Sequence, residues 1–509
     1  MLFNSYIYLL LFLPAVLLGY QLLRRAPFCA SVVFLSAASL IYYGYWDWTN
    51  LWIIGASCLF NFSCGRFLSR HRASRSGRLI LTAGVTANLG LLAWYKYAGF
   101  LAKAVAAVSE SGLPIPEFVL PLGISFFTFQ QIAYLVDAWR GETEEYHFAD
   151  YLLFVTFFPQ LIAGPIVHHR EMLPQFKRHQ GLGLRPTDLA VGSTLLFLGL
   201  FKKVVLADYL ARTANPIFEL AHGGDRYITF GEAWAAALSY TLQIYFDFSA
   251  YSDMAIGSAR LFGIRLPVNF HSPYKAASII DFWRRWHITL SRFLRDYLYI
   301  PLGGNRLGNA RRYTNLMTTM LIGGLWHGAG WTFILWGGLH GLYLCINHAW
   351  HWLGRRFSLP KIPRPVAVLI TFLAVVVAWV PFRAGSFEIT SEGSMTDALQ
   401  TSGIILASMF GFQGFDLWAP DAVIVATSTR AWRPILLGLL LVWAFPNTQQ
   451  FMRRYFPALG LGELPGGALG PRRRWQWRPT LVWLLFILAI LYAVSRDFDK
   501  ISEFIYFQF

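Results

Sequence analysis

Long apolar stretches, separated by short polar ones, dominate the pattern of this 509-residue chain. A helix needs roughly 20 mainly apolar residues to cross a bilayer, and several stretches reach that length while others fall short of it. The pattern predicts an all-α polytopic membrane protein with roughly 11–13 membrane helices, including short or re-entrant ones. The predicted segments are 2–23, 29–46, 51–68, 79–100, 118–136, 148–167, 189–206, 234–246, 313–325, 333–352, 366–382, 435–445 and 481–494.

Composition agrees with a membrane protein. The chain is 56% hydrophobic and only 14% charged, whereas soluble domains are about 25% charged. The net charge of +16 is expected to come from loops that meet anionic lipid headgroups, and no nucleic-acid partner is predicted. Arg24–Arg25 and the basic stretch 66–78 lie one helical hairpin apart, so both are expected on the cytoplasmic side, with the N-terminus outside.

Two histidines stand in one of the most apolar stretches, GGLWHGAGWTFILWGGLHG (323–341). Gly328 and Gly330 predict that the helix breaks there, so that His327 ends one helix beside a cavity. An ionisable residue at membrane depth is a functional candidate, and a neutral imidazole suits a general base near neutral pH. The alternative, a packed and hydrogen-bonded histidine, stays open for both His327 and His340.

The stretch FWRRWHITLSRFLRDYLYI (282–300) is amphipathic when it is projected as one helix. Its polar face carries Arg284, Arg285 and Arg292, which predicts a helix at the membrane interface with a basic face. His287 falls within the apolar face, so its ring is expected to point into the protein. The alternative for His287 is an interfacial histidine bonded to a neighbouring carbonyl.

Acidic residues inside an apolar stretch need partners, because a charge at membrane depth is costly. The stretch QIYFDFSAYSDMAIG (243–257) places Asp247 and Tyr251 one helical turn apart, and Asp253 follows. We expect both acids to hold basic residues in the core, and a place for Asp247 and Tyr251 in the lining of a functional site is the alternative.

Several catalytic motifs do not occur in the sequence. There is no Walker loop, no dinucleotide-binding glycine motif, no GxSxG and no HExxH. A metal site on His168 and His169 is not expected, because adjacent side chains diverge and no third ligand stands nearby in the sequence. Neither a bound metal nor a bound cofactor is predicted.

Five segments resemble the membrane-bound O-acyltransferase family, MBOAT, and they occur in that family's order. They are PLGISFFTFQQIAYLVD (121–137), FFPQLIAGPIVHHREMLPQF (157–176), YFDFSAYSDMAIG (245–257), PYKAASIIDFWRRWHITLSRFLRDYLYIPLGGNR (273–306) and the 323–341 stretch. The resemblance is greatest to the bacterial branch that serves alginate and cellulose acetylation and teichoic acid D-alanylation. It implies one membrane domain over residues 1–509, with an MBOAT core at 1–385 built around a central tunnel. Residues 386–509 are expected to add a C-terminal loop and the last membrane helices.

The resemblance also implies an activity and a location. The expected protein is an O-acetyltransferase of the bacterial inner membrane that uses a cytoplasmic thioester, acetyl-CoA, to acetylate an exported polysaccharide of the alginate or cellulose type. Its expected partners are an extracytoplasmic acetyltransferase and the polysaccharide synthesis and export machinery. Alternatives are D-alanyl or other acyl transfer to a cell-envelope polymer, and a non-enzymatic transporter or scaffold.

Residue roles follow from the same resemblance. His327 corresponds to the family's catalytic histidine, His287 to its second characteristic histidine, and His340 to a further one of the alginate-type branch. Trp326 and Trp331 are expected to exclude water from the reaction. The basic face of 284–295 is expected to bind either the phosphates of CoA or lipid headgroups.

Overall fold

The computed structural model describes the chain except residues 73, 110–118, 144–145, 179–182, 225–226, 391–394, 418–428, 465–475, 499–503 and 506–509. The described part is helical and contains no β-strand, which confirms the all-α prediction. The first helices are α1 (Leu13–Leu22), α2 (Phe28–Gly44), α3 (Leu51–Arg70), α4 (Arg75–Leu92), α5 (Ala98–Ser109), α6 (Ile124–Arg140), α7 (Phe148–Thr156), α8 (His169–Arg178), α9 (Pro186–Phe201) and α10 (Asp208–Gly223). They are followed by α11 (Phe230–Leu261), α12 (Ile279–Trp283), α13 (Ile288–Leu294), α14 (Gly308–His327), α15 (Trp331–Phe357), α16 (Arg364–Thr390), α17 (Met395–Met409), α18 (Thr429–Ala444), α19 (Thr448–Phe451) and α20 (Leu481–Ser495).

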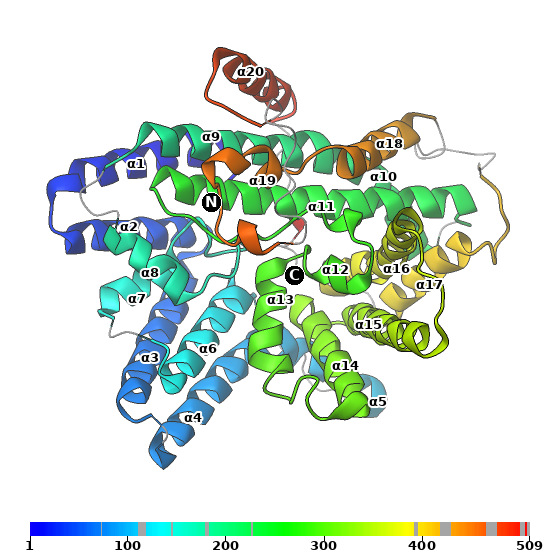
Figure 1. Cartoon of the computed structure of the whole chain (residues 1–509), viewed down its shortest axis with the longest axis horizontal. Helices are drawn as coiled ribbons and strands as arrows, with labels where there is room; N and C mark the ends of the chain where they lie inside the picture. The colour runs from blue at the N-terminus through cyan, green and yellow to red at the C-terminus, as the bar shows by residue number, and fades with distance from the viewer. Residues whose placement is uncertain are drawn as a thin grey trace.

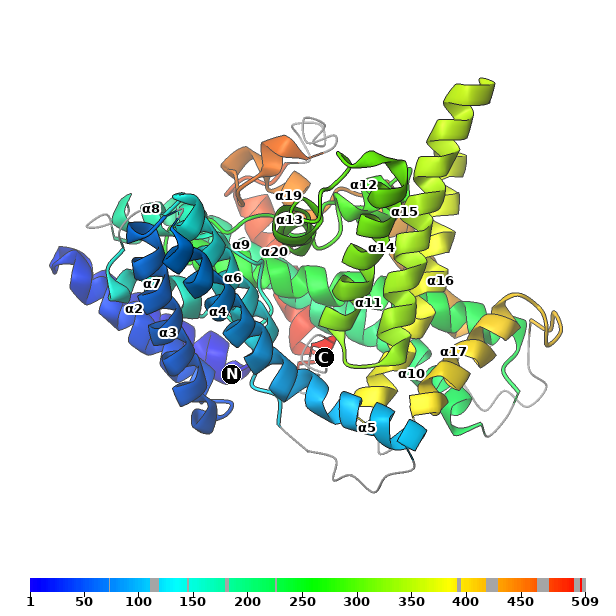
Figure 2. The same ribbon diagram turned by 90° about the horizontal axis from the view of Figure 1, so that it is seen from below.

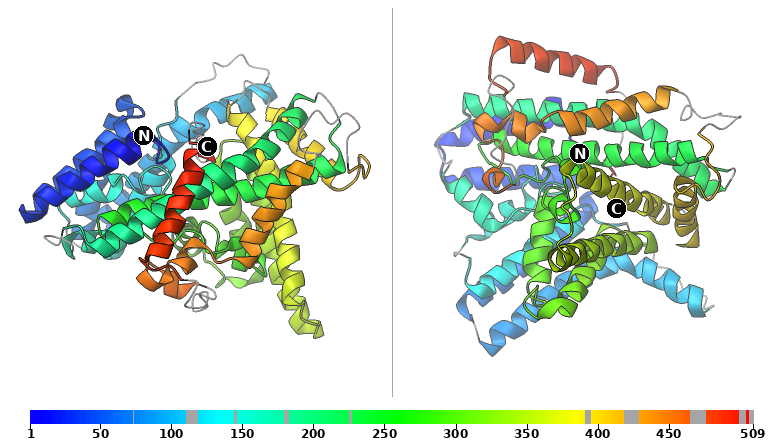
Figure 3. Two further views of the ribbon diagram at one scale, coloured as in Figure 1. Left: turned by 90° about the horizontal axis from the view of Figure 1, so that it is seen from above. Right: turned by 45° about the vertical axis from the view of Figure 1, so that its right-hand side comes forward.

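A layer of long helices crosses the molecule. Helices α9 and α10 follow each other in one helical run, Pro186–Gly223, which lies beside α11, and α20 lies outside this pair (Figures 1 and 3). Both α3, α4 and α6, at the left, and α13, α14 and α15, at the centre and right, lie below this layer in Figure 1. The far end of α15 projects beyond the neighbouring helices (Figure 2).

Helix α11 forms the centre of this arrangement. It begins at a capping box in which the side chains of Thr229 and Glu232 each accept from the other's backbone N–H. Nearly every residue along its length is buried. A helix that is buried on all sides belongs to the core of a large protein rather than to its lipid-facing surface.

Five described helical segments are long and apolar enough to cross a membrane, and three shorter apolar helices accompany them. The five are Ile7–Arg25, Trp48–Arg70, Arg75–Ala106, Pro186–Gly223 and Arg364–Phe387, and the three are Cys29–Gly44, Ala431–Ala444 and Leu481–Ser495. Other predicted segments, including 118–136 and 234–246, fall largely in helices α6 and α11, whose residues are mostly buried inside the protein. Apolar length alone therefore does not separate lipid-facing spans from buried core helices.

The glycines of the 323–341 stretch serve two purposes. Helix α14 ends at His327 and α15 begins at Trp331, so the predicted break is confirmed. At the crossing of these helices, a Cβ on Gly324 would lie 2.2 Å from the Phe333 carbonyl oxygen, and one on Gly337 would lie 2.4 Å from that of Met320. Only glycine permits so close an approach of the two backbones.

The prediction of one amphipathic helix over 282–300 is wrong. The chain forms α12, a turn, α13 and the π-helical segment η7 (Arg295–Tyr299). The turn ends at His287, whose backbone is left-handed, with φ 41° and ψ 54°. A helical projection assumes a continuous helix and cannot detect such a break.

Candidate active site

Three histidines from three helices gather where α13, α14 and α15 meet. His287 precedes the first residue of α13, His327 is the last residue of α14, and His340 lies in α15. The rings of His287 and His327 have centroids 6.4 Å apart, and the indole of Trp336 lies 5.0 Å from His327 and 4.8 Å from His340. All three histidines are buried, so the predicted inward orientation of His287 is confirmed.

Tryptophans enclose these histidines. Trp326 packs against His327, with ring centroids 5.0 Å apart, and Trp283 packs against His340, at 5.1 Å. The indole N–H groups of Trp283, Trp326, Trp336 and Trp379 are buried and have no hydrogen-bond partner among the described protein atoms. Buried donors without partners are rare in proteins, and here they offer hydrogen bonds to a carbonyl or oxyanion of a bound substrate.

The ring of His287 is fixed by Asn269. The Nδ1 atom of His287 lies 3.2 Å from the amide oxygen of Asn269, and the Thr289 hydroxyl donates to the same oxygen over 2.9 Å. Since an amide oxygen only accepts, this bond places the proton of the neutral ring on Nδ1 and leaves Nε2 as the acceptor. The Asn269 amide nitrogen donates to Ser252, which fixes the orientation of the amide.

The end of α14 is also held from outside. The Lys96 ammonium donates to the backbone carbonyls of Trp326 and His327 over 2.6 and 3.1 Å, and the Tyr97 hydroxyl donates to that of Leu325 over 2.8 Å. The last carbonyls of a helix have no partner within it and carry partial negative charge, so a cation is favoured there. Lys96 and Tyr97 therefore position the backbone that carries His327.

An arginine-lined cavity of about 820 Å³ lies next to this cluster. Arg284, Arg292 and Arg295 line it, and so does Trp283, which touches His340. Glu171 pairs with Arg292 through two contacts of 2.7 and 3.0 Å. The cavity thus combines cationic groups with an apolar wall that reaches the histidines.

Arg285 does not line this cavity. Its guanidinium donates to the Asp281 carboxylate over 2.8 Å and to the His271 carbonyl over 3.3 Å. Burial and the nearby charge of Arg285 lower the pKa of the His271 ring to about 4, so this ring is neutral at physiological pH. Arg285 thus stabilises the loop before α12, and its predicted role in donor binding is not supported.

Three other predicted residues lie away from the histidine cluster. Trp331 is 41% exposed and packs against Phe100, so Trp336 rather than Trp331 supplies the indole beside His327. Asp247 pairs with Lys203 over 2.7 Å, and Asp253 pairs with Lys202 over 2.7 Å, which confirms that both acids hold basic residues in the core. Tyr251 stacks on Phe3 with ring centroids 4.9 Å apart.

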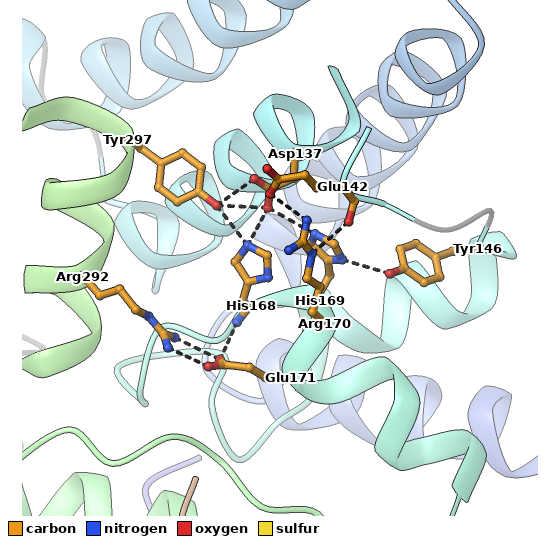
Figure 4. A network of polar contacts seen from close by, with 9 residues as sticks. All are labelled: Asp137, Glu142, Tyr146, His168, His169, Arg170, Glu171, Arg292 and Tyr297. Atoms are coloured by element: carbon orange, nitrogen blue, oxygen red, sulfur yellow. Dashed lines mark hydrogen bonds and ion pairs between the residues drawn. The ribbon is translucent and has the colours of Figure 1, made fainter. Parts of the chain in front are cut away.

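The expectation that the His168 and His169 side chains diverge, with no third ligand nearby, is wrong. Both rings approach the carboxylate of Asp137, at the end of α6, although 30 residues or more separate them along the chain (Figure 4). His168 lies in the loop before α8, whereas His169 is the first residue of α8, so the two rings are not bound to the divergent directions of one continuous element.

Comparisons with known proteins identify the family of this chain. The family model described as MBOAT, membrane-bound O-acyltransferase family, matches residues 38–384. The chain therefore belongs to the membrane-bound O-acyltransferase family, and it is a polytopic membrane enzyme of the acyltransferase class.

Particular relatives narrow the comparison further. The chain is 44% identical to a peptidoglycan O-acetyltransferase of Helicobacter pylori over 76% of this chain and 78% of the relative. It is 41% identical to a probable alginate O-acetylase of Pseudomonas aeruginosa over the full length of both chains. A teichoic acid D-alanyltransferase of Streptococcus thermophilus is 30% identical over 45% of this chain and 57% of the relative.

Proposed function

We propose that this protein is an inner-membrane O-acetyltransferase that takes an acetyl group from cytoplasmic acetyl-CoA for the O-acetylation of an exported polysaccharide of the alginate or cellulose class. The observation that carries this proposal is the buried pair His287 and His327, with ring centroids 6.4 Å apart, beside the arginine-lined cavity. The acetyl transfer named for the two relatives above, on alginate and on peptidoglycan, supports acetyl as the group transferred.

In the proposed reaction, an acceptor hydroxyl oxygen attacks the thioester carbonyl carbon while the neutral imidazole of His327 takes the hydroxyl proton. The tetrahedral intermediate collapses, its carbon–sulfur bond breaks, and the CoA thiolate leaves with the proton returned by His327. General base catalysis of this kind contributes about 10²–10⁴-fold. The indole N–H groups of Trp326 and Trp336 are available to stabilise the developing oxyanion, and His287 orients the reacting groups.

The donor and the acceptor are proposed to reach His327 separately. Arg284 and Arg292 bind phosphates of acetyl-CoA in the cavity, because guanidinium groups match phosphate geometry. The immediate acceptor is a hydroxyl of an extracytoplasmic acetyltransferase partner, which passes the acetyl group to the polysaccharide. Peptidoglycan is a second candidate for the final acceptor, because the relative that is 44% identical is named for it.

The test is the amount of ester-linked acetyl on the host's secreted polysaccharide and, in parallel, on its isolated peptidoglycan. Wild type is compared with His327→Ala, and His351→Ala serves as the control, because His351 is an exposed histidine of α15. Membrane levels of the three proteins are matched by immunoblot. We expect His327→Ala to lower the acetyl content at least about 100-fold on one of the two polymers while that polymer is still made.

Each alternative gives a different result. Unchanged acetyl in His327→Ala would exclude His327 as the base. Loss of the secreted polymer itself would indicate a transporter or scaffold. Loss of D-alanyl ester in place of acetyl would identify a different acyl group.

A further inference from the structure

A second cluster of polar side chains lies outside the histidine site. Asp137, His168 and His169 form a group of three whose possible ligand atoms all lie within 4.8 Å of one another. Among the described residues, no other group of His, Cys, Asp or Glu has this arrangement. The His168 Nε2 and the His169 Nε2 lie 2.5 and 3.2 Å from one oxygen, Oδ2, of Asp137.

A fourth polar atom completes the cluster. The hydroxyl of Tyr297, in η7, lies 3.0 Å from both Asp137 oxygens and 3.0 Å from the His168 Nε2 (Figure 4). Two imidazoles therefore converge on Oδ2 of Asp137, and the phenol of Tyr297 lies equally close to both oxygens of that carboxylate.

We propose that Asp137, His168 and His169, with Tyr297 as the nearest fourth group, bind one divalent transition-metal ion of the Zn²⁺ class. Two imidazole nitrogens and one carboxylate oxygen are a ligand set typical of zinc, whereas Ca²⁺ and Mg²⁺ prefer oxygen ligands throughout. Tetrahedral zinc with bonds of about 2.0–2.1 Å separates neighbouring ligand atoms by about 3.3 Å. His169 Nε2 already lies near that distance from Asp137 Oδ2, and His168 needs a shift below 1 Å, roughly the difference between 2.5 and 3.3 Å.

The surroundings of the cluster hold the ligands in place. The Tyr146 hydroxyl lies 2.9 Å from the His169 Nδ1, and the Glu171 carboxylate accepts from the His168 backbone N–H over 3.1 Å. Metal-binding histidines usually have a hydrogen-bond partner on the ring nitrogen that does not bind the metal, as the His169 Nδ1 does here with Tyr146. Asp137 and His169 are almost fully buried, which excludes competing water.

Three arginines lie near this position. Two are each paired with a separate carboxylate, Arg170 with Glu142 over 2.6 Å and Arg292 with Glu171 over 2.7 Å (Figure 4), and the third, Arg140, lies over the Tyr297 ring, 5.6 Å from its centroid. The Asp137 carboxylate is therefore left to balance the charge of the metal. A bound ion would tie α6 to α8 and η7, and through Glu171 it would hold the wall of the arginine-lined cavity.

The experiment uses the full chain, purified in detergent with an affinity tag that contains no histidine. Zinc per chain is measured by elemental analysis before and after chelation and after zinc is returned. Cobalt is then added to the metal-free protein, because Co²⁺ reports tetrahedral coordination by nitrogen and oxygen ligands in its visible spectrum. We expect about one ion per chain and an intense tetrahedral Co²⁺ spectrum for wild type.

Variants separate the ligands from their surroundings. His168→Ala is the first choice, because the His168 side chain is 23% exposed and its removal leaves no large internal gap. We expect it to weaken zinc binding at least about 100-fold and Tyr146→Phe to weaken it about 10-fold. His71→Ala, which removes an exposed histidine, should bind zinc as wild type does.

Two results would overturn the proposal. One is wild-type protein that takes up neither Zn²⁺ nor Co²⁺ in stoichiometric amount, a measurement that does not depend on any variant folding. The other is His168→Ala that binds zinc as tightly as His71→Ala does. Neither result depends on the acetyltransferase activity proposed above.

Discussion

His287 combines a strained backbone with a fixed ring. Its left-handed conformation, with φ 41°, costs roughly 1–2 kcal/mol for a residue other than glycine. The hydrogen bond between its Nδ1 and the Asn269 side chain directs the ring toward His327. Strain that the surrounding contacts maintain is typical of functional sites, because it fixes a reactive group in one orientation.

Asn269→Leu should therefore impair catalysis as well as folding. The substitution removes the acceptor for the His287 Nδ1 proton, and an unsatisfied buried donor costs about 1–3 kcal/mol. Without this acceptor the His287 ring can carry its proton on Nε2 instead of Nδ1. We expect acetyl transfer to fall about 10–100-fold, because that range corresponds roughly to the cost of about 1–3 kcal/mol. The measurement is the initial rate of acetyl transfer in membranes with matched protein levels.

Ser252→Ala is the matched control for this prediction. It removes the hydrogen bond that the Asn269 amide nitrogen donates to the Ser252 hydroxyl, and it leaves the contact between His287 and the Asn269 amide oxygen in place. Its rate should stay within about 5-fold of wild type, since one neutral hydrogen bond contributes about 1 kcal/mol. Equal losses in the two variants would show that the Asn269 network is only structural.

Helix ends and breaks, more than helix interiors, build this site. His327 ends α14, His287 precedes α13, and both ends are held by side chains from distant segments, Lys96 and Asn269. The sequence predicted the break after His327 because glycines mark it. It did not predict the break before His287, where neither glycine nor proline stands, nor did it predict the partners, which depend on contacts between residues far apart in the chain.

Lys96→Met should loosen the end of α14. Methionine keeps the apolar stem but removes both hydrogen bonds to the Trp326 and His327 carbonyls. Hydrogen bonds to charged groups contribute about 1.5–3 kcal/mol each, so we expect a lower thermal unfolding midpoint and a reduced transfer rate. Lys103→Met, in the next helix α5, is the control, and the prediction fails if both variants unfold at the same temperature.

Several contacts place the arginine-lined cavity on the same side of the protein as the basic loops. Arg72, in the basic stretch 66–78, lies beside Gly141 at the end of α6. The next residue, Glu142, pairs with Arg170 of α8, and Glu171 of the same helix pairs with Arg292 at the cavity. The distribution of basic residues in loops predicts that this side faces the cytoplasm. Figure 2 shows α8, α12 and α13 on one side and the N-terminus toward the other.

Only part of the fold and of the candidate site could be predicted from the sequence. The apolar pattern was enough to predict the all-α membrane class, and histidines in apolar surroundings were enough to mark His287, His327 and His340. The pattern could not predict that Trp336 rather than Trp331 faces His327, because both are tryptophans of one apolar helix. Nor could it reveal Asp137 as the partner of His168 and His169, because only the tertiary fold brings the end of α6 close to the start of α8.

If the cavity admits acetyl-CoA, the reaction should depend on the side of the membrane that receives the donor. Inverted vesicles expose the basic side to the medium, and right-side-out vesicles do not, so CoA release from added acetyl-CoA should occur only in the inverted ones.

In those vesicles Arg284→Gln should raise the KM for acetyl-CoA about 3–10-fold with little change in kcat, because a partly exposed pair of charges contributes about 1 kcal/mol. Arg311→Gln, at an exposed arginine outside the cavity lining, should leave the KM unchanged. Equal KM values for the two variants would show that Arg284 does not bind the donor. CoA release only in right-side-out vesicles would show that the orientation inferred from the basic loops is wrong.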